Sequence, residues 1–207
     1  MSDFWKRQDV LLRSERPADK RGTYLYDWAY ALMGVQSEAE TDGWAEALAP
    51  DEARCATRIA CLEMNGFASF IEALEAAHPQ IVIDVIVTET LAQWRSLLGS
   101  NQAEMPHDVS YHGTQNMKVA VAQALAAEFG GLSAPAIENG TNAIEYEVSL
   151  VSEYGRPEDI EAVITVVLSR LAEEGDAHGF WLKQLAYLDI EAACVQLLTC
   201  PPRLPHS

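Results

Sequence analysis

The feature of this sequence that most constrains its fold is a helical period in the apolar residues. The period is clearest at Ile160, Val163, Ile164, Val167, Leu168 and Leu171. Intervals of three and four residues place these side chains on one face of an α-helix. Proline and two acids at 157–159 precede them, which is typical of a first helical turn. The segment is therefore predicted to be helical despite its β-branched residues, whose strand propensity is the weaker signal.

The same period recurs along the rest of the chain. It predicts helices over residues 79–98, 117–129, 144–155 and 181–198, and shorter ones over 24–32, 44–48, 51–63 and 67–78. Longer loops are expected around 99–113 and 130–141. No segment has the alternating pattern and hairpin signals of paired strands. We predict an all-α fold of stacked antiparallel helix pairs, either a HEAT-like α-solenoid or an irregular helical bundle.

Charge divides the chain into an arm and a body. Residues 1–22 carry a net charge of +2, whereas the whole chain carries −17 and the remainder therefore −19. We predict a basic N-terminal arm or helix over 1–22, an all-α helical-repeat domain over 23–200 and a tail over 201–207. Two alternatives are open for the arm. It docks on its own acidic body or on a neighbour, or it is a solvated helix of mixed charge.

The acidic surplus also excludes classes of function. Nucleic acids and anionic membranes attract basic surfaces, so we expect neither as a partner. The first twenty residues are mostly polar, and the apolar run at 81–87 is too short to span a bilayer, which favours a cytoplasmic location. In that compartment the four cysteines are expected to be reduced, buried thiols without a zinc-site spacing: Cys55, Cys61, Cys194 and Cys200.

Two motifs in the stretch 52–82 carry a resemblance to a known family. They are A-x-x-E-x-N-G-F over residues 60–67 and L-x-A-A-H-P-x-x-V over residues 74–82. This stretch resembles the helical-repeat (HEAT-like) regions that follow the ATPase in large bacterial NACHT-type signalling NTPases. No Walker A motif is present, so no ATPase residue is carried over. The resemblance implies the sensor or scaffold part of such a protein.

Four aromatic residues near the N-terminus form the candidate partner-binding patch: Tyr24, Tyr26, Trp28 and Tyr30. At intervals of two they cannot all face the interior from one helix. Tyrosine and tryptophan provide large anchoring area at protein interfaces. The alternative is that the rings pack against the basic arm or against the segment near Trp44. Trp181 is expected in the core.

The only local group of catalytic residue types is His107, Asp108 and His112, in the predicted loop 99–113. A histidine beside an aspartate is able to act as a base or to bind a metal. No third ligand or H-E-x-x-H motif accompanies them, so a polar loop is the preferred interpretation. His78, before Pro79, is predicted to end a helix. We expect no catalytic residue, metal or cofactor.

These patterns favour recognition over catalysis. The first hypothesis is a non-catalytic protein-interaction or scaffold module, as the helical-repeat segment of a larger bacterial signalling or defence protein. The alternative is a stand-alone acidic immunity or inhibitor protein that binds a basic enzyme. An all-α enzyme using the 107–112 segment is the third. In the first two cases the expected partner is another protein with a basic surface.

Overall fold

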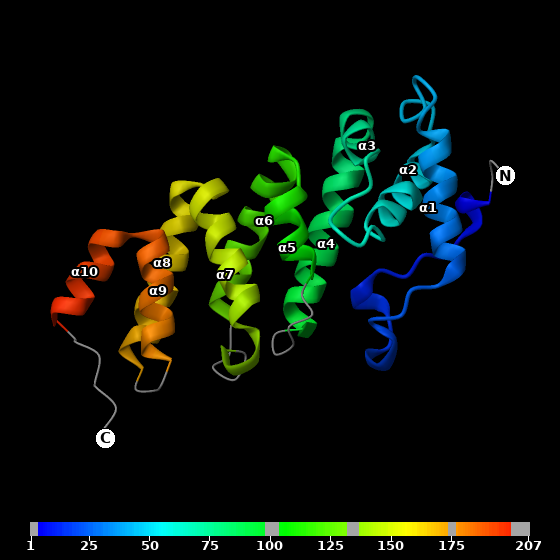
Figure 1. Ribbon diagram of the computed structural model, residues 1–207. Helices are drawn as coiled ribbons and strands as arrows, with labels where there is room; N and C mark the ends of the chain where they lie inside the picture. Colours follow the sequence, from blue (N-terminus) through cyan, green and yellow to red (C-terminus); the bar gives the residue numbers. More distant parts are fainter. Residues whose placement is uncertain (1–3, 98–103, 132–136, 174–176, 200–207) are drawn as a thin grey trace. The chain divides into compact units, whose positions relative to one another are not determined.

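The computed structural model describes residues 4–97, 104–131, 137–173 and 177–199. Within these ranges all regular elements are helical and no strand is present, which confirms the all-α class (Figure 1). The chain divides into two compact units. Unit 1 comprises Met1–Ser96 and Ala103–Ala120, and unit 2 comprises Leu97–Gln102 and Val121–Ser207. The second division falls inside helix α6 (Gln115–Glu128).

Unit 1 begins with three short 3-10 turns, and these are followed by α-helices. The turns are η1 (Trp5–Arg7), η2 (Arg13–Glu15) and η3 (Ala18–Lys20). The helices are α1 (Tyr26–Glu38), α2 (Pro50–Ala60), α3 (Ile71–Ala77), α4 (Pro79–Leu97) and α5 (Glu104–His112). The first 22 residues thus contain no α-helix in their described part, so the helical alternative for the arm is wrong.

Prolines and caps set the helix boundaries in unit 1. Pro50 occupies the first turn of α2, where its missing N–H costs little, and the Glu52 carboxylate accepts the Ala49 N–H at 3.0 Å. His78 has φ −133° and ψ 55°, outside the helical region, as expected for a residue before proline. This residue ends α3, as predicted, and its ring Nε2 bonds the carbonyl oxygen of Ala45 at 2.8 Å.

The helix predicted over residues 44–48 is wrong. The segment forms a series of hydrogen-bonded turns that follows Gly43, whose φ of +73° lies in the left-handed region. Its aromatic side chain nevertheless belongs to the core. The Trp44 ring packs 5.8 Å from Phe70 and 6.5 Å from Trp5, measured between ring centroids. Packing of this ring, rather than helical hydrogen bonding, accounts for the apolar residues in the segment.

The arm packs onto its own unit. Trp5 is 0% exposed, and Val10 and Leu12 are buried with it. Turn η1 contacts both α1 and α2, and a Cβ built on Gly34 of α1 would lie 3.7 Å from the Trp5 ring. Of the two alternatives for the arm, docking on the body is the one observed.

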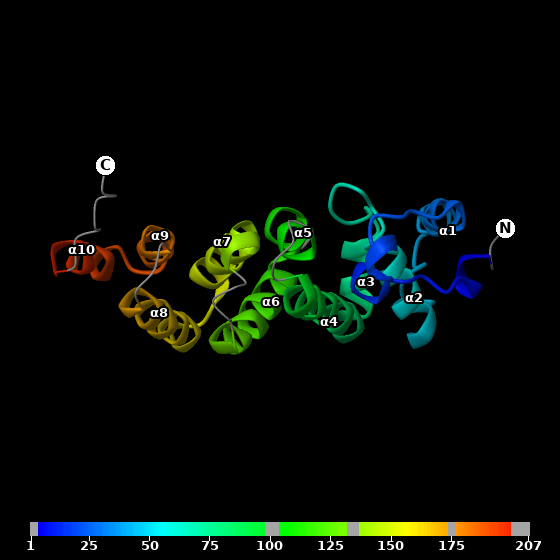
Figure 2. The ribbon, with the colours of Figure 1, turned by 90° about the horizontal axis from the view of Figure 1, so that it is seen from below.

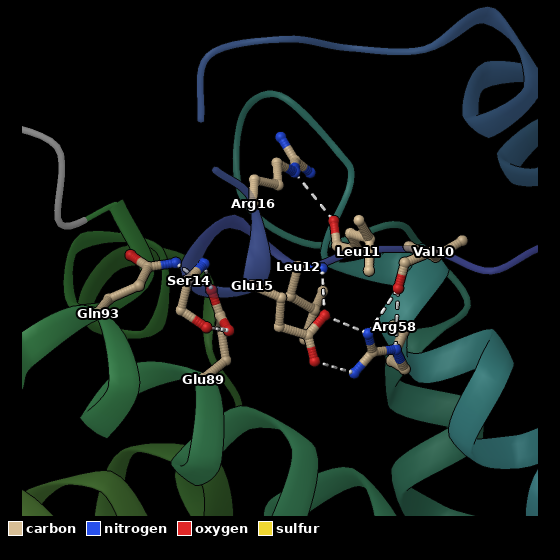
Figure 3. Close-up of polar contacts among 9 residues, drawn as sticks. All are labelled: Val10, Leu11, Leu12, Ser14, Glu15, Arg16, Arg58, Glu89 and Gln93. Carbon is tan, nitrogen blue, oxygen red and sulfur yellow. Dashed lines mark hydrogen bonds and ion pairs between the residues drawn. The ribbon is translucent and has the colours of Figure 1, made fainter. Parts of the chain in front are cut away.

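Polar contacts fix the middle of the arm, as Figure 3 shows. The Arg58 guanidinium on α2 donates from Nε to the Val10 carbonyl oxygen at 3.1 Å and from Nη1 to Glu15 Oε1 at 3.0 Å. Glu15 in turn accepts the Leu12 N–H at 2.8 Å. One cation on the body thus holds a backbone carbonyl and a carboxylate of the arm.

Glu89 on α4 provides the second anchor (Figure 3). Its side chain is 2% exposed, and its carboxylate accepts the Ser14 N–H at 2.9 Å and the Ser14 Oγ–H at 2.5 Å. Gln93 Nε2 donates to the same carboxylate at 2.7 Å, and Gln93 Oε1 accepts the Met105 N–H at 3.0 Å. This chain of bonds joins the arm, α4 and the start of α5.

Unit 2 contains the end of α6, the turn η4 (Phe129–Gly131) and four further helices. These are α7 (Ile137–Tyr154), α8 (Pro157–Ala172), α9 (His178–Leu188) and α10 (Ile190–Thr199). Helix α8 follows the predicted stripe, with Val163, Val167 and Leu171 buried. It packs against α7 and α9, and Figure 2 shows α8 on one side of the unit with α7 and α9 on the other.

Two contacts show that α7 and α9 run in the same direction. Lys183 on α9 pairs with Glu145 on α7 at 2.8 Å, and Ser152 Oγ on α7 donates to the Tyr187 carbonyl oxygen at 2.9 Å. The order of the contacts is the same along both helices. Helix α8 connects them in the opposite direction, so each sequential pair in this part of unit 2 is antiparallel.

The single helix predicted over residues 181–198 is wrong, because the chain breaks at Asp189. This residue is extended, with φ −152° and ψ 100°, and its Oδ1 accepts the Ala192 N–H at 3.0 Å. It therefore caps a new helix, α10, and changes the phase of the apolar stripe. Val195 and Leu198, which belong to the apolar period of 181–198, are 57% and 85% exposed, and Ala193 is buried.

The core of unit 2 includes one carboxyl group. Trp181 is buried, as predicted, with its ring 6.4 Å from Phe129. Glu147 on α7 is 0% exposed, and neither of its oxygens has a hydrogen-bond partner among the described residues. Burial, reinforced by the negative charge of Glu128, raises the pKa of Glu147 well above its usual value.

This buried carboxyl predicts a pH dependence for the stability of unit 2. Because the pKa of Glu147 is higher in the folded than in the unfolded chain, folding binds a proton above pH about 4.3. The free energy of unfolding should then fall as pH rises towards the folded-state pKa, by up to about 1.4 kcal/mol per pH unit. Glu147→Gln should remove this slope and raise the stability at neutral pH.

The measurement is hydrogen exchange of the unit 2 amides across a pH series, corrected for the intrinsic exchange rate. Glu161→Gln is the matched control, since Glu161 is exposed on α8. Equal pH slopes in wild type and Glu147→Gln would contradict the assignment of a neutral buried carboxyl.

Candidate functional site

The predicted aromatic patch lies at the start of α1 and divides between the surface and the core. Tyr26 is 84% exposed, Tyr30 is 60% exposed and Tyr24, just before the helix, is 40% exposed. Trp28 is only 5% exposed. Three of the four predicted residues are thus accessible to a partner, and the fourth supports the helix that presents them.

Trp28 is covered by the arm and by a neighbouring ring. The Arg16 guanidinium lies 4.4 Å from the centroid of the Trp28 ring, a cation–π contact. The Tyr24 ring meets it edge-on at a centroid distance of 6.3 Å. The alternative of packing against the arm therefore holds for Trp28.

Tyr24 lies between two opposite charges. Burial and the nearby Glu63 carboxylate raise the pKa of its hydroxyl, while Arg16 acts in the opposite direction. Its phenol therefore stays neutral at physiological pH and is available as a hydrogen-bond donor and acceptor.

The accessible face of α1 extends beyond the four predicted aromatic residues. Met33 is 66% exposed and follows Tyr26 and Tyr30 at positions i+7 and i+3, so the three side chains share one helix face. The opposite face holds buried residues, namely Trp28, Ala31 and Val35. Met33 lies two helical turns after Tyr26, so the helical period predicts that it shares a face with Tyr26. A search for aromatic residues alone does not find it. We call Tyr26, Tyr30 and Met33 the α1 surface stripe.

His107, Asp108 and His112 lie on helix α5, so the predicted loop over 99–113 is wrong for its part from residue 104 onwards. Residues 98–103 lie outside the described chain. His107 Nδ1 lies 3.3 Å from Asp108 Oδ1, and the His107 and Tyr111 ring centroids are 4.7 Å apart. Burial raises the pKa of Asp108, and the hydrogen bond from His107 opposes that effect.

His112 does not join His107 in a site. It lies against the turn that contains Gly66, whose φ is +110°, and a Cβ at that glycine would come within 2.6 Å of the His112 ring. Within the described residues no group of three histidine, cysteine or acidic side chains is arranged to hold a metal. The geometry of α5 therefore gives a hydrogen-bonded His–Asp pair beside a tyrosine ring and a separate packing role for His112.

The cysteines differ in accessibility. Cys55 and Cys61 are part-buried free thiols, and burial raises the pKa of both. Such thiols are poor nucleophiles because the thiolate is disfavoured. Cys194 on α10 is exposed, contrary to the expectation of burial. Cys200 lies outside the described residues.

Comparisons with protein-family models, curated proteins and solved structures found no match to this chain. In the described part of the chain, no helix combines the length and apolar character needed to cross a bilayer. The α1 surface stripe is the candidate site, because it gathers large, accessible side chains on a helix fixed from behind by buried ones.

Because α1 has a buried and an exposed face, substitutions on the two faces should change the free energy of unfolding by very different amounts. Trp28→Ala should lower the free energy of unfolding by about 3–5 kcal/mol, because it removes a buried ring. Tyr26→Ser and Tyr30→Ser should each change it by less than about 0.5 kcal/mol, because both rings face solvent. Urea unfolding followed by circular dichroism measures each change. A large loss from either tyrosine variant would show that the stripe packs within the molecule.

Proposed function

We propose that this chain is a non-catalytic protein-interaction module and that the α1 surface stripe binds its partner. The observation that carries the proposal is the exposure of Tyr26, Met33 and Tyr30, at 84%, 66% and 60%, on one face of one helix. Tyrosine and methionine are enriched at protein interfaces, where their area anchors binding. The buried Trp28 beneath fixes the helix, so binding orders few additional groups.

The charge of the molecule supports a partner with a basic surface. The chain carries −17 overall, and Asp27, beside the stripe, is exposed. Opposite charges on two partners speed their encounter and select against the wrong ones. The partner we propose is thus a protein with an apolar contact patch ringed by lysine or arginine.

The parallel course of α7 and α9 supports the proposed helical-repeat organisation. In helical-repeat proteins equivalent helices of successive repeats run parallel, with a connecting helix in between. Unit 2 has this arrangement in α7, α8 and α9. Together with the resemblance over residues 52–82, this favours a scaffold or sensor segment of a larger bacterial signalling or defence protein.

The alternative proposal is an acidic immunity or inhibitor protein that neutralises a basic enzyme. The acidic surplus favours this alternative, since the chain contains 31 acidic residues and only 14 lysines and arginines. In that case the acidic surface, and not the stripe, would supply most of the binding energy.

The stripe is tested by comparing three forms of the full chain in cross-linking capture from cells of the source organism. Tyr26→Ser/Tyr30→Ser should lose the partner that wild type captures, because the anchoring rings are removed. Tyr187→Ser is the matched control, since Tyr187 is a 58% exposed tyrosine on α9, and it should retain the partner. Equal capture by wild type and the double variant would reject the stripe as the binding surface.

Once a partner is in hand, a salt series separates the two proposals. Raising ionic strength from about 0.1 M to about 1 M shortens the Debye length from about 10 Å to about 3 Å. A stripe-driven complex should keep most of its affinity, because apolar contacts are not screened. Binding that collapses over this range, measured by calorimetry, would favour the acidic inhibitor instead.

A further inference from the structure

Unit 1 contains a cleft of about 240 Å³ between the arm and the body. Residues of the arm from Leu12 onwards, together with Thr23 and Tyr24 just after it, form one wall. The other wall comes from the segment after α2 and from helices α4 and α5, including Cys61, Glu89 and Met105. This volume is below the roughly 300–1,000 Å³ typical of pockets for drug-sized ligands, so the occupant must be small.

The charges of the two walls are opposite. All of the arginines in the lining come from the arm, namely Arg13, Arg16 and Arg21. All of the acids come from the body, namely Glu63, Glu89, Glu104 and Asp108. The cleft thus has a cationic wall facing an anionic wall.

Some of these charges are already used within the molecule. Arg13 pairs with Glu104 across the cleft. The Glu89 carboxylate is occupied by the Ser14 hydroxyl and amide and by Gln93. Glu104 is therefore paired, whereas Glu89 is bonded to neutral groups, keeps its charge and acts electrostatically on Arg13 and Arg16.

Arg16 and Arg21 have no carboxylate partner within the described residues. Within the described ranges Arg16 donates only to backbone carbonyls, of Leu11 at 2.9 Å, Thr23 at 3.1 Å and Arg21 at 3.2 Å. The Arg21 side chain makes no hydrogen bond or ion pair to the described residues, and its Nε is buried without a partner. Unpaired guanidinium groups in a chain with twice as many acids as bases are unexpected, because acceptors are plentiful.

The anionic wall also holds unpaired charge. Among the described residues, Glu63 accepts only the Met64 N–H, at 3.0 Å, and Asp108 bonds to the ring of His107. Neither forms an ion pair with a lysine or arginine in the described chain. Each wall of the cleft thus has charged side chains without a lysine, arginine or carboxylate as ion-pair partner among the described residues.

We propose that this cleft binds a small zwitterion with one carboxylate and one ammonium group, namely a free amino acid. The carboxylate would lie at the Arg21 guanidinium, and the ammonium at Asp108 and Glu63. A guanidinium is suited to a carboxylate because its paired N–H groups match the two oxygens. A polyanion would meet repulsion from the four acids, and a simple cation would meet it from the arginines.

This site is separate from the α1 surface stripe, and it does not depend on the proposed function. A ligand here would bridge the arm and the body, adding to the bonds that Glu89 and Arg58 already make. The site therefore couples occupancy to the docking of the arm, since a ligand that binds only the closed cleft stabilises that state.

The experiment is isothermal titration calorimetry of the full chain with each of the twenty common amino acids, at fixed ionic strength. For any amino acid that binds, its N-acetyl and its amide derivative, which lack the ammonium and the carboxylate respectively, are titrated next. Both derivatives should bind at least about tenfold more weakly, as expected when one charged hydrogen bond is lost.

Two variants assign the walls. Arg21→Gln should weaken amino-acid binding by about tenfold or more, and Asp108→Asn should weaken it while leaving the N-acetyl derivative unchanged. Arg54→Gln is the matched control, since Arg54 is an exposed arginine of the same unit outside the cleft, and it should bind as wild type does. The proposal is overturned if no amino acid binds, if the derivatives bind equally well, or if Arg21→Gln binds as tightly as Arg54→Gln.

Discussion

The carboxylate of Glu89 is the contact on which most of unit 1 depends. A carboxylate that is 2% exposed is costly to bury unless its oxygens are bonded, and Ser14 and Gln93 meet that requirement. The ligands come from the arm and from α4 itself, so the cost of burying Glu89 is offset only while the arm is docked. Detachment of the arm would leave the carboxylate without Ser14, whose two bonds are therefore cooperative with Trp5 packing.

Docking of the arm also determines the two surfaces described above. Arg16 covers one face of Trp28, and Trp28 holds the buried side of α1. The orientation of Tyr26 and Tyr30 towards solvent is thus set from below by an arm residue. The same arm supplies the cationic wall of the cleft. The arm thus positions both the α1 surface stripe and the polar cleft, although its described part contains no α-helix.

Much of the fold follows from local patterns, and the exceptions have identifiable causes. The stripe in α8 repeats over four turns, so its period was decisive. Asp189 caps a new helix within the segment 181–198. The intervals between apolar residues do not reveal this break, because a single capping residue leaves them unchanged. Helix α5, predicted as part of a loop, contains Pro106 in its first turn, where proline is tolerated. The cleft depends on contacts between residues 75 positions apart, such as Ser14 and Glu89, for which sequence offers no local signal.

The basic residues of the arm connect the features described above. Six of the fourteen basic residues lie in the first 22 positions, and three of them contact the rest of unit 1: Lys6 pairs with Glu52, Arg13 pairs with Glu104, and the Arg16 guanidinium lies over the Trp28 ring. Lys6 and Arg13 each neutralise one carboxylate, whereas Arg16 contacts an uncharged ring. The two ion pairs leave the net charge of the remaining residues at −17, and three arginines of the arm, Arg13, Arg16 and Arg21, line one cleft. A molecule of this kind can attract a basic protein over distance and still hold a carboxylate locally, because screening limits each field to its own surroundings.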